Sequence, residues 1–212
     1  MRAALESGAR ELGVSLSDTQ IAQLLQYLDL IQKWNKVYNL TAVRDPGEML
    51  TQHLLDSLAV INPLRRQTGA HPIKKLLDVG SGAGLPGVVI AIACPEIDVD
   101  CVDTVGKKAA FIQQAAVTLQ LPNLRGLHNR VEKLTTKYDI VCSRAFASLA
   151  DFVNLSSGAL AEQGLWLAMK GKNPTAELAA LPAGVAVFHV EQLKVPGLEA
   201  ERCIVWMKRT VG

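Results

Sequence analysis

The first 70 residues have the hydrophobic period of amphipathic α-helices. Apolar side chains recur every three or four positions over residues 21–34, and a Ser-x-x-Gln capping box stands just before them. A second helix is expected over residues 45–61, because Asp45 can act as its N-cap and a proline follows at the first turn. Residues 65–71 lack such a period, and we expect a loop there. A helical unit is therefore predicted for residues 1–70.

From residue 73 onward the period changes, and short apolar runs alternate with helical stretches. The runs are predicted to be strands over residues 75–79, 99–103, 124–127, 138–143 and 165–169. Helices are expected between them over residues 86–94, 107–119 and 149–160. This alternation is typical of a parallel α/β sheet. The last two β-rich runs, 185–193 and 203–208, have no helix between them, and we expect them to pair antiparallel. The chain thus divides into a helical cap, residues 1–70, and a seven-stranded α/β domain, residues 71–212.

Composition narrows the class of protein. Of the 212 residues, 49% are hydrophobic and 20% are charged, which excludes a disordered chain and a coiled coil. No uninterrupted apolar run reaches the roughly 18 residues that a membrane span needs. The first six residues lack the apolar core of a signal peptide, and we expect the protein in the reducing cytoplasm. The net charge of +2 is too small to indicate a nucleic-acid partner by itself.

The positions of cysteine and histidine argue against metal or redox chemistry. The four cysteines have no Cys-x-x-Cys spacing and stand inside apolar runs; they are Cys94, Cys101, Cys142 and Cys203. The four histidines are scattered without the i, i+4 spacing of a metal site; they are His53, His71, His128 and His189. We therefore expect buried thiols and no bound metal.

The most informative stretch lies where the first predicted strand meets the next helix, at residues 77–87. Its glycines permit positive φ and carry no Cβ, so backbone amides can approach a ligand closely at a helix N-terminus. A dinucleotide fingerprint would need glycine at the position of Leu85, and it gives no reason for an acid at Asp78. An acid two residues before the alternating glycines Gly80 and Gly82 is instead typical of an S-adenosylmethionine loop. A structural turn or a site for another nucleotide is the alternative.

A second acidic residue supports a cofactor that contains a ribose. Asp103 ends the second predicted strand, 23 residues after Gly80. Doubly wound folds place a carboxylate at this point, where it accepts hydrogen bonds from ribose hydroxyl groups. The alternative role for Asp103 is a helix N-cap, because the predicted helix over residues 107–119 begins soon after it.

Two further segments follow the third and fourth predicted strands, at the same carboxyl edge of the sheet. Val131 and Glu132 stand where such sheets supply a backbone amide and a polar side chain to an adenine; a solvated loop is the alternative. Arg144 and Phe146 follow the fourth strand, and an arginine beside an aromatic ring suits a purine. Arg144 could also have a purely structural role as the ion-pair partner of Asp78 or Glu132.

Motifs that the sequence lacks exclude two kinds of methyl acceptor. Methylation of an exocyclic amine usually uses an Asn/Asp-Pro-Pro-aromatic tetrad after the fourth strand, where this chain has Ser-Arg-Ala-Phe at residues 143–146. Methylation of a pyrimidine at carbon 5 needs a cysteine nucleophile near that edge, whereas Cys142 stands inside the strand. Guanine N7 has an in-plane lone pair and no proton, so it needs no activation. These absences leave an acceptor that needs no activation, and guanine N7 fits that description.

These motifs together resemble the glucose-inhibited division protein B family, bacterial methyltransferases that act on guanine N7 of small-subunit ribosomal RNA. The resemblance spans nearly the whole chain and rests on residues 33–41, 53–57, 78–87, 103, 106–108, 130–132, 143–147 and 170–171. It implies a Rossmann-like, seven-stranded S-adenosylmethionine-dependent methyltransferase fold. It also implies cofactor contacts by Gly80, Leu85, Val131, Glu132 and Arg144.

The sequence thus predicts transfer of the S-adenosylmethionine methyl group to guanine N7 of 16S ribosomal RNA, either as RNA or in the 30S particle. The protein is expected to be a monomer that binds no membrane, with Arg144 acting in catalysis. The residues expected to bind the cofactor are Asp78, Gly80, Gly82, Leu85, Asp103, Val131, Glu132 and Arg144. Two rival functions stay open at this point, a small-molecule methyltransferase and a noncatalytic cofactor-binding regulator.

Two segments are candidates for contact with RNA. Residues 33–41 are expected to end a helix in a polar turn and to cover the cofactor cleft, with Asn39 and His53 as candidate contacts. Residues 170–172 read Lys-Gly-Lys and follow the fifth predicted strand, so their charges are expected at the ligand edge.

Overall fold

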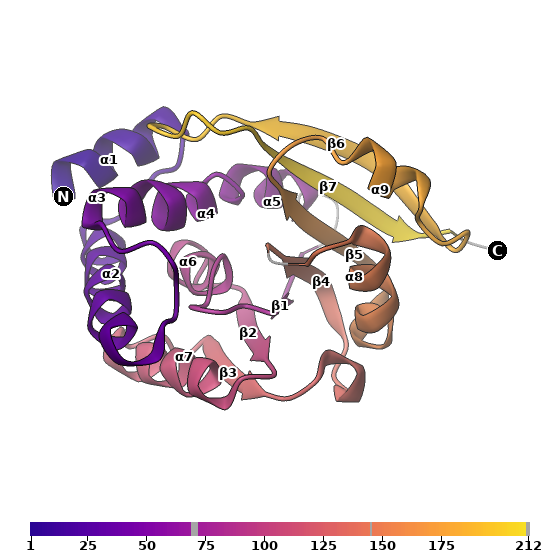
Figure 1. Cartoon of the computed structure of the whole chain (residues 1–212), viewed down its shortest axis with the longest axis horizontal. Helices are drawn as coiled ribbons and strands as arrows, with labels where there is room; N and C mark the ends of the chain where they lie inside the picture. Colours follow the sequence, from indigo (N-terminus) through magenta and orange to yellow (C-terminus); the bar gives the residue numbers. More distant parts are fainter. Residues whose placement is uncertain (69–71, 145, 211–212) are drawn as a thin grey trace.

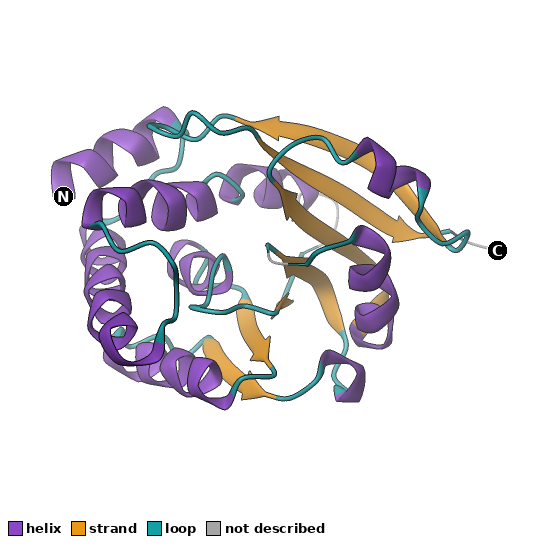
Figure 2. Cartoon of the chain, in the orientation of Figure 1, coloured by secondary structure: helices purple, strands orange, loops and turns teal. Residues whose placement is uncertain are grey.

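A single seven-stranded sheet forms the centre of the computed structural model, which describes residues 1–68, 72–144 and 146–210 (Figures 1 and 2). The strand order is β3-β2-β1-β4-β5-β7-β6, with the first five strands parallel and β7 antiparallel to both of its neighbours. The strands are β1 (Lys75–Val79), β2 (Asp98–Asp103), β3 (Leu124–His128), β4 (Tyr138–Ser143), β5 (Leu160–Lys170), β6 (Val185–Leu193) and β7 (Arg202–Arg209). The expected parallel sheet and its antiparallel final pair are both confirmed.

The helices lie on both faces of this sheet. The N-terminal helical elements are α1 (Arg2–Glu11), α2 (Asp18–Tyr38), α3 (Pro46–Met49), the π-helical η1 (Leu50–Leu55), α4 (Asp56–Leu58) and α5 (Ile61–Thr68). The later ones are α6 (Gly87–Ala93), α7 (Gly106–Thr118), η2 (Val131–Lys133), α8 (Leu149–Ser156), η3 (Ser157–Ala159) and α9 (Thr175–Ala179). The predicted capping box of α2 is present, and Asp45 caps α3 through the amide of Glu48 at 2.9 Å.

Three details of the sequence-based expectation are wrong. The loop expected from residue 65 is helical as far as Thr68, because Arg65 and Arg66 favour the last turn of a helix; residues 69–71, including His71, lie outside the described part of the chain. The single helix expected up to residue 61 is divided into short helical segments with a π-helical turn in the middle. The helix expected up to residue 160 ends at Ser156, and β5 begins at Leu160.

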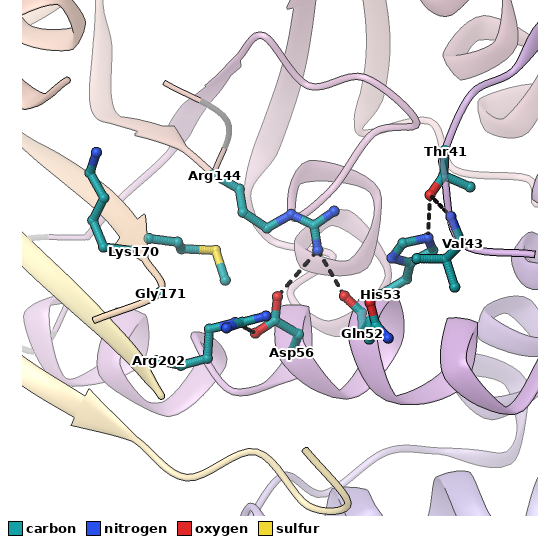
Figure 3. A pocket seen from close by; sticks show the side chains of 10 residues that line it. Thr41, Val43, Gln52, His53, Asp56, Arg144, Lys170, Gly171 and Arg202 are labelled. Atoms are coloured by element: carbon teal, nitrogen blue, oxygen red, sulfur yellow. Dashed lines mark hydrogen bonds and ion pairs between the residues drawn. The ribbon is translucent and has the colours of Figure 1, made fainter. Parts of the chain in front are cut away.

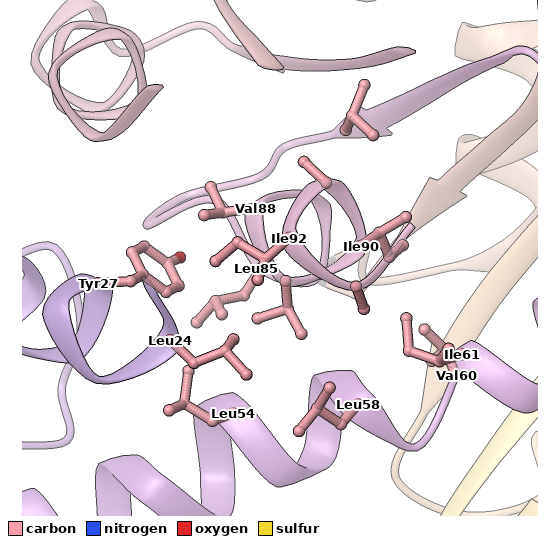
Figure 4. Packing of buried hydrophobic residues seen from close by; sticks show 14 of the residues in the cluster. Leu24, Tyr27, Leu54, Leu58, Val60, Ile61, Leu85, Val88, Ile90 and Ile92 are labelled. Carbon is pink, nitrogen blue, oxygen red and sulfur yellow. The ribbon is translucent and has the colours of Figure 1, made fainter. Parts of the chain in front are cut away.

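Two hydrophobic layers enclose the sheet. Successive side chains of a strand point to opposite faces, so Leu76 packs with the N-terminal helices, α6 and α7, while Leu77 packs with α8. Figure 4 shows the first layer, in which Leu24 and Leu54 from the N-terminal helices meet Leu85 beneath the glycine-rich turn. Each fully buried leucine contributes about 1.5–3 kcal/mol. The N-terminal helices are therefore held firmly against the segment that carries the glycines.

Candidate active site

Two cavities open at the carboxyl edge of the parallel strands. The first, of about 500 Å³, lies at the ends of β1, β2 and β3 and is called here the glycine-loop cavity. The second, of about 410 Å³, lies beyond β4 and β5 and beside the start of β7, and is called the arginine cavity because Arg144 and Arg202 line it. The strand order reverses between β1 and β4, and open α/β sheets bind their ligands at such a switch point.

The turn after β1 needs glycine for two different reasons. Gly80 and Gly82 have φ values of 66° and 59°, which are left-handed, and no atom lies within 4 Å of a Cβ placed on either. Gly84 has a φ of 89°, and a Cβ there would stand 2.5 Å from Val88. The first two positions therefore leave open space above the backbone, and the third is fixed by packing.

The amides of this turn are already hydrogen-bonded within the protein. Gly80 donates to the carbonyl of Val102 at 2.9 Å, and Gly82 donates to Oδ2 of Asp103 at 3.0 Å. Both amides therefore already have partners within the protein, and the cofactor contacts expected of Gly80 and Gly82 stay a prediction. The missing side chains leave open space above both residues.

Asp103 joins the glycine turn to the start of the next helix. Its Oδ2 accepts from Gly82, and its Oδ1 accepts from the amide of Val105 at 2.8 Å. Asp103 is not the N-cap of α7, because that position belongs to Val105. The carboxylate is nearly buried but lines the glycine-loop cavity, so it can accept a hydrogen bond from a hydroxyl group there.

Asp78 lies beneath the turn and does not line either cavity. It is fully buried, and its Oδ2 accepts from the amide of Gly87 at 2.8 Å. Burial raises the pKa of this carboxyl to about 7, although the Gly87 amide and the charge of Arg144 act in the opposite direction. Leu85 is also buried under the turn, where its side chain belongs to the hydrophobic layer (Figure 4).

The wall of the glycine-loop cavity has the composition that an adenosine needs. Four of the residues expected from the sequence line it together, namely Gly80, Asp103, Val131 and Glu132. Residues that were not assigned a cofactor contact complete the wall: Val79, Val102, Thr104, Asn129, Arg130, Phe146 and Leu155. Apolar groups for a flat ring thus stand beside two carboxylates that accept hydrogen bonds, so the residues fit the cofactor.

The arginine cavity is organised around one buried carboxylate (Figure 3). Arg144 donates through Nη1 to the carbonyl of Gln52 at 2.9 Å and to Oδ2 of Asp56 at 3.2 Å. Arg202 donates through Nε to Oδ1 of the same Asp56 at 3.0 Å. The expected structural partners of Arg144 were Asp78 and Glu132, and neither of them is the one observed.

The candidate RNA contacts differ in how far they are exposed to solvent. His53 is buried with Nε2 2.9 Å from Oγ1 of Thr41, and burial and Arg144 both lower its pKa, so its imidazole is neutral. Asn39 is exposed and left-handed at the end of α2, as the expected polar turn requires. Lys170 lines the arginine cavity at the expected edge, where it is mostly buried and donates to Glu177 at 2.8 Å. Lys172 is exposed.

The described part of the chain has neither a metal-binding cluster nor a membrane-spanning helix. Residues 1–68, 72–144 and 146–210 contain no group of three or more His, Cys, Asp or Glu side chains that could hold a metal ion. No helix within those ranges is both long and apolar enough to cross a membrane. The four cysteines are buried free thiols, as expected.

Several solved structures that share this fold are named as methyltransferases. TrmN from Thermus thermophilus aligns with a TM-score of 0.59 at 18% identity, over 76% of this chain and 53% of that one. The N-methyltransferase NodS from Bradyrhizobium japonicum, solved with S-adenosyl-L-homocysteine, aligns with a TM-score of 0.59 at 10% identity, over 85% and 100%. The protein therefore has the fold of S-adenosylmethionine-dependent methyltransferases.

Sequence relatives define the family within that class. The family model GidB, rRNA small subunit methyltransferase G, matches residues 20–205. A ribosomal RNA small subunit methyltransferase G from a Polaromonas species is 67% identical over 207 residues, 96% of this chain and 92% of the relative. Its counterpart in Albidiferax ferrireducens is 67% identical over 216 residues, 98% and 96% of the two chains. The chain belongs to the rRNA small subunit methyltransferase G family, which confirms the resemblance found from the sequence.

Proposed function

We propose that this protein transfers the methyl group of S-adenosylmethionine to N7 of a guanine in 16S ribosomal RNA of the small ribosomal subunit. One observation carries the proposal: a chain 67% identical to small subunit methyltransferases G has an adenosine-sized cavity and an arginine-lined cavity at one edge of its sheet. We further propose a monomer that works in the cytoplasm, with residues 1–70 as a cap on the methyltransferase domain.

The glycine-loop cavity is the proposed cofactor site. Asp103 would accept from the ribose hydroxyl groups, and Val131 and Glu132 would contact the adenine. Gly80 and Gly82 would give the cofactor room above the backbone. Asp78 and Leu85 lie beneath the turn and would stabilise its left-handed backbone conformation without touching the cofactor. The bound cofactor supplies an already activated methyl group.

The acceptor needs alignment and no general base. Guanine N7 offers a lone pair without a proton, so the protein has to place it in line with the carbon–sulfur bond and exclude water. The methylated base is cationic, and a strong positive field at N7 would oppose the transfer. We therefore propose that Arg144 contacts the O6 edge of the guanine or the cofactor, and that it does not contact N7 itself.

An exposed aromatic and basic patch at the end of α2 is the proposed RNA contact. The Tyr38 side chain is 41% exposed, and Nζ of Lys107 lies 5.2 Å from the centre of its ring. Lys36 is exposed on the same turn. An exposed tyrosine beside lysines offers a base-stacking surface next to charges for phosphates. This patch favours RNA over the two rival functions, a small-molecule methyltransferase and a noncatalytic regulator.

The proposal is tested by tritiated methyl transfer from S-adenosylmethionine. The acceptors are small ribosomal subunits from a strain that lacks its own enzyme of this family, the same RNA without proteins, and large subunits. We expect incorporation close to one methyl group per small subunit and none into large subunits. Cofactor binding in calorimetry with no transfer to either small-subunit acceptor would instead support the noncatalytic regulator, and transfer only to a metabolite would support the small-molecule enzyme.

The proposed attack by N7 predicts that no cysteine is required. Burial raises the pKa of the Cys142 and Cys101 thiols well above the usual range, so neither forms a thiolate nucleophile at neutral pH. We expect Cys142→Ala to keep the rate of methyl transfer within a few-fold, and to lower the free energy of unfolding by about 1 kcal/mol or more. A folded variant that binds cofactor and transfers nothing would point to covalent attack on a pyrimidine.

A further inference from the structure

We propose that Asp56 is a positioning residue, which holds Arg144 and Arg202 as a two-guanidinium clamp for the nucleotide that receives the methyl group. This inference rests on the proposed function. It concerns a side chain for which the sequence suggested no role, because Asp56 stands in α4, far along the chain from both arginines.

The geometry joins three separate parts of the fold at one carboxylate. Asp56 is only 1% exposed, and its two oxygens each accept from a different guanidinium, at 3.2 Å from Arg144 and 3.0 Å from Arg202. The two arginines stand 88 and 146 positions away along the chain, after β4 and at the start of β7. Figure 3 shows both side chains pointing toward the carboxylate, Arg144 from above and Arg202 from the left. Both arginines remain partly exposed to the cavity, so they are held and still reachable.

The charge balance explains why one carboxylate would serve two arginines. Two guanidinium groups and one carboxylate leave a net formal charge of +1 in the cavity. The other titratable groups of the wall add nothing to this, because Lys170 is paired with Glu177 and His53 is neutral. A net charge of +1 attracts the electron-rich O6 edge of guanine or a phosphate oxygen. It opposes formation of the cationic product less than a net charge of +2 would. The shared carboxylate also removes rotamer freedom from both arginines before RNA arrives.

The alternative is a purely structural ion-pair network that ties α4 to β7. The structure contains a matched control for that role. Asp100 is 3% exposed, its two oxygens accept from Arg125 at 2.7 Å each, and it also accepts from the Tyr138 hydroxyl at 2.7 Å. This pair lines neither cavity. The Arg125 side chain is 65% exposed, so Asp100→Asn reports the effect of removing the charge of a buried aspartate beside an arginine where no catalytic role is proposed.

The test compares Asp56→Asn with Asp100→Asn in single-turnover methyl transfer to small subunits, with cofactor affinity and melting temperature measured on the same preparations. We expect Asp56→Asn to lower the rate per folded molecule at least 30-fold while the cofactor Kd stays within about twofold. Asp100→Asn should lower the melting temperature and keep the rate within about twofold. If Asp56→Asn loses stability and keeps its rate, Asp56 is a structural tie and the proposal is wrong.

A double-mutant cycle shows whether Asp56 affects the rate of methyl transfer through Arg144 or independently of it. If Asp56 acts through Arg144, then Asp56→Asn combined with Arg144→Lys should be no slower, within about threefold, than the slower single variant. Losses that multiply would overturn the inference. Should Asp56→Asn fail to fold, Asp56→Glu keeps the charge and shifts the guanidinium groups, and we expect a slowed reaction at near-normal melting temperature. An unchanged rate in Asp56→Glu would also refute the clamp. Absence of transfer by the unaltered protein would count against the proposed function, and not against the clamp alone.

Discussion

Gly80→Val is expected to abolish detectable binding of S-adenosylmethionine while the protein still folds. Gly80 has a φ of 66°, and left-handed backbone strains a residue with a Cβ by roughly 1–2 kcal/mol. The open space above the residue would then be filled by the branched side chain, in the place where the cofactor is proposed to lie. Isothermal titration calorimetry should report an affinity at least about 100-fold weaker, which corresponds to about 3 kcal/mol.

The control for Gly80→Val places a valine at another glycine with left-handed backbone, away from the proposed cofactor site. Gly13 has a φ of 68° in the turn after α1 and lines neither the glycine-loop cavity nor the arginine cavity. We expect Gly13→Val to lower the melting temperature and to leave cofactor affinity unchanged. A folded Gly80→Val protein that binds the cofactor as tightly as the unaltered one would remove the glycine-loop cavity from the account.

Arg144→Lys is expected to slow methyl transfer by roughly 30- to 1,000-fold, a loss of transition-state stabilisation on the order of 2 to 4 kcal/mol. A guanidinium forms several hydrogen bonds in fixed directions, here to Gln52 and Asp56, and lysine cannot reproduce that geometry. Lysine still supplies a positive charge to pair with Asp56, so the melting temperature should change by only a few degrees.

Single-turnover rates and melting curves on one preparation of Arg144→Lys decide between its two possible roles. A large loss of rate at nearly constant melting temperature is the predicted result. The opposite pattern, a lowered melting temperature with the rate per folded molecule intact, would mean that Arg144 is only the structural partner of Asp56.

Most of the fold follows from local sequence patterns. The strands of the sheet were found because each is a short apolar run beside a turn, and β1, β4 and β6 have the expected bounds. The helices α1 and α9 were not predicted, because α1 is mainly polar and α9 has only five residues. The break of the second helix at η1 has no counterpart in the hydrophobic pattern of the sequence.

The candidate site was only partly accessible to sequence reasoning. Strand-edge positions placed Gly80, Asp103, Val131 and Glu132 around one cavity, because the ends of parallel strands meet at one edge. Asp56 was missed, since its partners are brought to it by β4 and β7. The available signal was Asp56 as the one acid within the apolar residues 50–61, because a buried carboxylate requires partners.

The central claim is tested most directly by nucleoside analysis of the RNA after reaction. Small-subunit RNA methylated by the purified protein is digested to nucleosides and separated by chromatography with mass detection. Attack by guanine N7 predicts that the transferred label is recovered as 7-methylguanosine, and that Arg144→Lys reduces this product without creating another. Recovery of the label as 5-methylcytidine, or as a guanosine methylated on its exocyclic amine, would contradict the account.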